Sequence, residues 1–308
     1  MNATLCANTP PAATDGWCAT AALQFQQRHG RTQFQGGASA PLKLMRSSAQ
    51  SSGHCELPLL HTAGGLVGGD QLQLQVELGA GSRALLTSVA AQKVYGSVRR
   101  SRRHPQGSWA QQRLEVRQAA DSDLEWLPQE LVLYADALFE QTLQVELAEG
   151  ASFLGMEVVR LGRTAAGERL GEGCWRSRTE IRRLATASGG ERWELVDRLQ
   201  LSGEALEAEH GMAEQPVFGS LVWAAPEPIE GPALQQLLEQ AREARTGLEG
   251  SMACGALDQG LVARYRGPSS QAARFWFCRI WALLRAQRGQ DPPELPRVWP
   301  FQEQPLQP

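Results

Sequence analysis

The chain has 308 residues, of which 42% are hydrophobic, so it can bury a sizeable core in one large domain or two small ones. The formal net charge of -3 excludes a general attraction to nucleic acid or anionic lipid. The N-terminus lacks the apolar run of a signal peptide, and no later stretch is long enough to span a bilayer. We therefore expect a cytoplasmic protein with no nucleic-acid or membrane partner.

Residues 1–16 are rich in Ala, Thr, Asn and Pro, and we expect them to form a disordered leader. The folded part is expected to be a single β-rich domain over residues 17–290. Its first distinctive motif is GGLVGGD, Gly64 to Asp70. A phosphate-binding loop needs a helix after its glycines, but alternating residues follow Asp70 here. We interpret the glycines as a tight turn at a strand entry, with Asp70 either capping the turn or presented to a ligand.

A strand-turn-strand pattern dominates the chain up to about residue 203. Residues 71–78 alternate between polar and apolar, a glycine turn follows at 79–81, and a second apolar run covers 84–87. The pentapeptide LQVEL occurs at Leu74–Leu78 and again at Leu143–Leu147, with a looser copy from Leu114. The spacings of 40 and 29 residues are too uneven for a propeller or a strict solenoid. We predict a mainly β fold of irregular, β-helix-like layered strands.

The pattern becomes helical after residue 228. One helix is predicted near 232–246, with Pro232 at its first position, and a second near 269–288, capped by Ser269 or Ser270. These two helices form the small C-terminal helical portion of the predicted fold. The tail over residues 291–308 is rich in proline and is expected to be extended.

The metal-binding residue types are scattered. The six cysteines lie too far apart for a CxxC pair, so we expect most of them to be buried thiols. The five histidines form no HxH or HExxH motif, so no preformed zinc site is predicted. His54 and Cys55 could meet His61 across a hairpin and contact a metal there. Two further carboxylates, Glu130 and Glu168, stand like Asp70 near expected strand ends, where pairing with an arginine is the simplest role.

A basic run, RRSRRH, covers Arg99 to His104. Phosphate contacts would suit such a run, but it lacks interleaved aromatic residues and stands in a net-acidic chain. We interpret it as a solvated loop that is able to dock an acidic partner.

Taken in order, a set of motifs resembles the UreD (UreH) family of urease accessory proteins. The motifs that carry the resemblance are GRT (30–32), APLKL (40–44), GGLVGGD (64–70), ALLTS and AQKVY (84–95), EWLPQE (125–130), LGRTAAGE (161–168) and PRVW (296–299). They run over nearly the whole chain, and their order and spacing are specific although each motif alone is weak.

The resemblance implies a non-enzymatic scaffold and metallochaperone component. Proteins of this family bind UreF, which recruits the GTPase UreG, and the assembly docks on apo-urease to deliver nickel to its active site. The resemblance also implies a β-helical body with a polar internal passage for the metal. No cofactor is then held tightly: Ni²⁺ is transient, and GTP is used by the partner. A conduit must bind Ni²⁺ weakly, which scattered oxygen ligands achieve better than a closed Cys/His cage. Our candidates for the lining are Asp70, Gln92, Glu130 and Glu168.

Two other functions remain open at this point. A β-helical body suits a carbohydrate-active enzyme, with Asp70 and Glu130 as its carboxylate pair, although such an enzyme needs an aromatic-lined cleft. An Arg-rich nucleic-acid-binding protein would instead depend on the arginines at 99–103 and on salt concentration.

Overall fold

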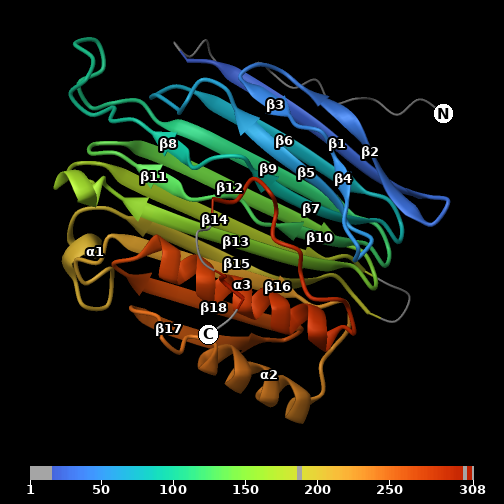
Figure 1. Cartoon of the computed structure of the whole chain (residues 1–308). Coiled ribbons are helices and arrows are strands. Elements are labelled where there is room, and N and C mark those ends of the chain that lie inside the picture. Colours follow the sequence, from blue (N-terminus) through green and yellow to red (C-terminus); the bar gives the residue numbers. More distant parts are fainter. Residues whose placement is uncertain (1–15, 186–188, 301–303, 307–308) are drawn as a thin grey trace.

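Two β-sheets face each other, and two helices cover the outer face of the second sheet (Figure 1). The computed structural model describes residues 16–185, 189–300 and 304–306. The first sheet has seven strands in the order β15-β14-β12-β9-β6-β1-β2. Their bounds are Cys18–Arg28 (β1), Arg31–Ala38 (β2), Gln71–Leu78 (β6), Ala110–Gln118 (β9), Leu138–Leu147 (β12), Cys174–Arg183 (β14) and Arg192–Leu201 (β15).

The second sheet has eleven strands, and its main path is β17-β18-β16-β13-β10-β7-β5-β3. The bounds are Leu42–Leu44 (β3), Ser48–Ala49 (β4), Cys55–His61 (β5), Arg83–Ser88 (β7), Gln92–Val94 (β8), Asp123–Trp126 (β10), Leu131–Leu133 (β11), Ser152–Leu161 (β13), Val217–Ala224 (β16), Ser251–Leu257 (β17) and Gly260–Gly267 (β18). The strands β4, β8 and β11 lie off the main path.

The predicted strand-turn-strand layers are confirmed. In each layer a strand of the first sheet leads through a turn into a strand of the second: β6 to β7, β9 to β10 and β12 to β13. Successive layers pair in parallel, so that Leu74 lies beside Leu114 and Leu114 beside Leu143. The three repeats therefore stack in register. Their uneven spacing arises in the loops, since the longer interval contains the exposed loop at 99–104.

Alternation along these strands builds the core between the sheets. In β6 the side chains of Leu72, Leu74, Val76 and Leu78 are buried while the intervening polar side chains face outward. Each buried leucine contributes about 2 kcal/mol from removal of its surface from water. The core between the sheets continues through Leu114, Val116 and Val145 of the neighbouring strands.

The predicted glycine turn is confirmed as well. Gly64 and Gly69 adopt φ values of 76° and 100°, in the left-handed region that favours glycine. A Cβ on Gly68 would lie 2.3 Å from the Ser97 hydroxyl, so that position admits no side chain without a shift. The strand β6 follows directly after Asp70.

Both predicted helices are present with slightly shorter bounds, as α2 (Gly231–Glu243) and α3 (Ser270–Gln287). The Ser269 hydroxyl accepts a hydrogen bond from the Ala272 N–H and caps α3, as expected. The large side chains of α3, including Trp276, Phe277 and Trp281, form a second core against the second sheet. A short helix α1 (Glu204–Glu207) and a 3₁₀ turn η1 (Thr164–Ala166) were not predicted.

The C-terminal segment packs along α3. Trp299 lies 6.0 Å from Trp281 between ring centroids, and its indole N–H donates to the Thr87 hydroxyl at 2.7 Å. Of the six cysteines, Cys6 lies outside the described residues, Cys18 is exposed, and the remaining four are buried free thiols, as predicted for most of them. Among the described residues, no helix combines the length and apolar character needed to cross a membrane.

Candidate functional site

A cavity of about 130 Å³ lies between the two sheets. Its lining comes from β6, β9, β12, β14 and β15 of the first sheet and, apart from one residue each of β8 and β11, from β3, β5, β7, β10, β13 and β16 of the second. These strands are successive neighbours in both sheets. The cavity therefore crosses the strands instead of running along one of them. Its middle is mainly apolar, with Leu74, Leu114 and Phe139 among the lining side chains.

Polar side chains gather at the end of the cavity that is lined by β12, β14 and β15 of the first sheet and by β13 and β16 of the second. Glu157 of β13 accepts a hydrogen bond from the Gln141 side-chain amide of β12, and the same amide donates to Ser177 at 3.2 Å. Asp197 of β15 accepts from Arg264 of β18 at 2.6 Å. This end of the cavity thus combines two carboxylates with amide, hydroxyl and guanidinium groups, all on rigid strands.

Burial between the sheets raises the pKa of Glu157 to about 7. The Arg264 guanidinium and the Gln141 hydrogen bond act against this rise, and the charge of Asp197 adds to it. Glu157 therefore exchanges its proton close to neutral pH. A cation that reaches this carboxylate competes with a proton, and it also competes with Arg264 for Asp197. The carboxylates of Glu157 and Asp197 can therefore bind a divalent cation and release it again.

His61 lines the opposite end of the cavity, where β5 pairs with β3. Its ring stacks on Trp17 with 6.4 Å between centroids. Gln92 and Ser88 belong to the same lining. Burial lowers the pKa of His61, against the opposing charge of Asp70.

Asp70 is the cap of the glycine turn. It is 2% exposed, and its two carboxylate oxygens accept the N–H groups of Trp17 at 3.0 Å and Val67 at 2.8 Å. It does not belong to the lining of the cavity. Of the two roles expected for Asp70, capping is the one for which the geometry is present.

The other candidate residues have separate positions. Gln92 lines the cavity, and its backbone N–H donates to the Glu130 carbonyl at 2.8 Å. The Glu130 side chain pairs with Arg274 at 3.4 Å. Glu168 accepts from the Ala135 N–H and from Arg163, whose hydrogen bond lowers the pKa of Glu168. Glu130 and Glu168 are thus paired with arginines, as their simplest role predicts, and neither lines the cavity.

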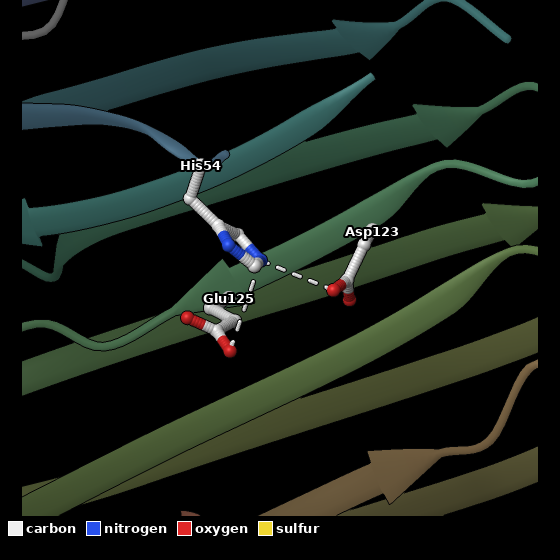
Figure 2. Close-up of side chains that lie close together, drawn as sticks. All are labelled: His54, Asp123 and Glu125. Carbon is white, nitrogen blue, oxygen red and sulfur yellow. Dashed lines mark hydrogen bonds and ion pairs between the residues drawn. The ribbon is translucent and has the colours of Figure 1, made fainter. Parts of the chain in front are cut away.

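A second group of possible metal ligands is buried beside α3: His54, Asp123 and Glu125 (Figure 2). Asp123 and Glu125 project from the same face of β10, two positions apart, and the His54 imidazole lies 3.1 Å from Asp123. Two guanidinium groups already bind the carboxylates. Arg285 pairs bidentately with Glu125, with its closer contact at 2.6 Å, and Arg288 contacts Asp123 at 2.8 Å.

Burial alone would raise the pKa of Asp123, but Arg288 and His54 outweigh it and hold that pKa well below its usual range. A divalent cation at this cluster would face two buried positive charges in direct contact with its ligands. The cluster therefore acts as an anchor between α3 and the second sheet, since its charges come from both elements.

The expected meeting of His54, Cys55 and His61 across a hairpin is wrong. His54 directly precedes β5 and His61 ends it, so the whole strand separates the two imidazoles. Burial also raises the pKa of the Cys55 thiol, which disfavours the thiolate that binds metals.

The neighbouring positions of Glu157, Asp197 and Gln141 were not predicted from the sequence. One signal was present: Glu157 is a single carboxylate within the otherwise apolar run SFLGMEVV. A charge in the middle of a buried strand needs a polar environment, and here the cavity provides it.

Comparisons with known proteins give sequence matches over nearly the whole chain. The family model described as UreD urease accessory protein matches residues 18–300. The urease accessory protein UreD of Synechococcus sp. (strain CC9902) is 62% identical over 290 residues, covering 94% of this chain and 93% of the relative. Its counterpart in Synechococcus sp. (strain WH7805) is 61% identical, covering 96% and 94%. UreD of Prochlorococcus marinus (strain MIT 9303) is 59% identical, covering 89% and 91%.

Proposed function

Because this chain belongs to the UreD family of urease accessory proteins, we propose that it is a non-enzymatic scaffold that passes Ni²⁺ to apo-urease. In this proposal it binds UreF, UreF recruits the GTPase UreG, and the assembly docks on the urease apoprotein. GTP is consumed by UreG, and Ni²⁺ is the cargo, which moves through the cavity between the two sheets.

The observation that carries the proposal is the position of Glu157 inside that cavity. Its carboxylate lies between the sheets, is hydrogen-bonded by Gln141, and exchanges a proton near neutral pH. Oxygen ligands of this kind bind a first-row divalent ion less tightly than a cage of thiolates and imidazoles. Rapid release is what a delivery route requires.

The surroundings of Asp197 support weak binding in the same way. Arg264 contacts this carboxylate at 2.6 Å and neutralises part of its charge. A Ni²⁺ ion at this end therefore contacts Asp197 only if it displaces Arg264 from this carboxylate or shares the carboxylate with it. The apolar middle of the cavity offers few further ligands, so the ion is held at discrete places and not along the whole route.

Expression of the urease subunits with UreF and UreG, with and without this chain, tests the proposal. Without the chain we expect apo-urease of low nickel content and low activity. Full activation without the chain would refute the delivery function.

The role of the cavity is tested by Glu157→Gln, which preserves the shape of the side chain and an acceptor for Gln141. We expect this variant to co-purify with UreF but to load urease with nickel more slowly. Glu149→Gln is the matched control, because Glu149 lies exposed in a turn. Equal nickel loading by both variants would show that the ion does not pass Glu157.

A further inference from the structure

The strand β2 forms one outer edge of the first sheet and pairs only with β1 (Figure 1). A two-residue turn at 29–30 joins the two strands and sets Arg28 opposite Arg31. The closing pair of such a hairpin is hydrogen-bonded, so every second residue of β2 directs its N–H and C=O away from β1. These residues are Thr32, Phe34, Gly36 and Ala38. Within the part of the chain that the structure describes, no hydrogen bond reaches their outward backbone groups.

The other three sheet edges carry features that disfavour the addition of a strand. The pairing of β15 with β14 is interrupted by a bulge, and its inward-facing Asp197 pairs with Arg264. The helix α2 lies along β17, where Arg242 donates to the Cys254 carbonyl at 3.0 Å. The edge strand β3 has only three residues. Bulges, inward charges, coverage and short length are the usual means by which proteins protect sheet edges.

The edge of β2 has none of these features. From Thr32 to Ala38 the strand contains no charged residue and no proline, and its register with β1 is continuous. Gln35 and the three residues after it are exposed. An open, uncharged edge of this length is a template for another strand.

A second copy of β2 matches this edge. Antiparallel pairing about a two-fold axis at Gln35 brings all four residues with outward backbone groups into hydrogen-bonded pairs. Thr32 then lies opposite Ala38, and Phe34 lies opposite Gly36. An aromatic side chain across from an edge glycine is a stabilising pair in sheets. One register therefore satisfies the backbone and the side chains together.

The charges fit the same register. Arg31 is the only charged residue of β2, and it meets Ser39 of the second copy instead of another Arg31. On the solvent face the Gln35 side chains of the two copies lie opposite each other, where two amides can hydrogen-bond. A strongly charged partner strand finds no ion pair along residues 32–38, whereas a neutral strand such as β2 leaves no charge unpaired.

We propose that β2 is a self-association edge, through which two copies of this chain pair in antiparallel and join their first sheets into one continuous sheet. Two-fold dimers are the commonest symmetric oligomers of soluble proteins. This self-association is separate from the proposed nickel delivery, because β2 contributes no residue to the lining of the cavity. A monomeric chain would leave the delivery proposal unaffected.

Charged variants of Gln35 test the self-association, since Gln35 is exposed and its replacement leaves the core unchanged. We expect the original protein to sediment as a dimer. Gln35→Lys and Gln35→Glu each set two like charges opposite each other and should weaken the dimer about fivefold. An equimolar mixture of the two variants should restore it. Gln73→Lys is the matched control and should dimerise as the original protein does, because Gln73 is exposed on the same sheet face in the inner strand β6.

A cysteine at this position gives a covalent readout. Gln35→Cys sets two thiols opposite each other in a non-hydrogen-bonded pair, where the side chains are close enough for a disulfide. The background for this variant is Cys6→Ser with Cys18→Ser, since Cys18 is exposed and Cys6 lies outside the described residues. Mild oxidation should give a covalent dimer of Gln35→Cys and none of Gln73→Cys.

Two results would overturn the self-association. One is a monomer at every protein concentration, together with no crosslinking of Gln35→Cys. The other is protection of the Phe34 and Gly36 amides from hydrogen exchange only after UreF or apo-urease is added, since a partner segment would then occupy the edge instead of a second copy.

Discussion

Gln141 on one sheet donates its side-chain hydrogen bond to Glu157 on the other, inside the cavity between them. This contact joins the two sheets through a group that titrates close to neutral pH. Local stability and the charge inside the cavity are therefore linked to the same proton.

The first prediction concerns Glu157→Gln and pH. Glu157 has a folded pKa of about 7 against an ordinary value of 4.5, so the folded chain holds its proton more tightly than the unfolded chain does. As pH rises from 4.5 to 7, the unfolded state ionises first and the protein loses stability, by about 3 kcal/mol in total. The variant lacks this loss. In urea unfolding, the free energy of unfolding of Glu157→Gln relative to that of the original protein should increase between pH 5 and pH 8. A difference that stays constant over this range would contradict the raised pKa.

Asp123 should show the opposite dependence. Its folded pKa is depressed, so it stabilises the fold above its ordinary value of 3.8, and the contribution is lost as pH falls below that value. We expect Asp123→Asn to be much less stable than the original protein at pH 6. At pH 3 the difference in unfolding free energy should be smaller. Unfolding free energies at the two pH values provide the measurement. A penalty that does not shrink in acid would show that Arg288 and His54 do not hold this carboxylate charged.

The anchor between α3 and β10 gives a third prediction. Arg285 and Glu125 are both 0% exposed, so Arg285→Met removes the bidentate partner of a buried carboxylate, leaves it the longer contact with Arg288 at 3.6 Å, and should cost about 3 kcal/mol. The double variant Arg285→Met with Glu125→Gln removes both charges and should recover a large part of that loss, because the amide oxygen still accepts from Trp281. A double-mutant cycle from urea unfolding checks this. Additive losses would mean that the two residues are not coupled.

A fourth prediction concerns the capping role of Asp70. Asp70→Ala leaves two backbone N–H groups without acceptors and should cost about 2 kcal/mol of folding free energy. Asp70→Asn keeps one acceptor and should cost about half as much. Thermal and urea unfolding of the two variants gives the comparison. If both are as stable as the original protein, the cap contributes nothing measurable.

The layered β fold was predictable because its cause is local. Alternation in β6 and the repeated LQVEL motif specify which side chains face the core, and Ser269 and Pro232 mark the helix starts. The register that places Leu114 between Leu74 and Leu143 follows from matching those faces.

The site was less predictable, because its contacts join distant parts of the chain. Asp70 and Glu168 stand out in the sequence as carboxylates next to glycines, yet one caps a turn and the other pairs with Arg163. Glu157 and Asp197 are 40 residues apart and line the same end of the cavity only because β13 and β15 face each other across it. Sequence periodicity gives the direction of a side chain within its own strand and not its partner on the opposite sheet.

The crossing of the strands by the cavity has a consequence for its dimensions. From β5 to β16 the second sheet has four strand-to-strand steps, which at a spacing of about 4.8 Å amount to a span of about 19 Å. In the proposed delivery route, the number of layers in the stack thus sets the distance that the ion travels. An insertion into a loop such as the 99–104 loop leaves that distance unchanged. One added layer would extend it by a single strand spacing and bring one more lining position from each sheet.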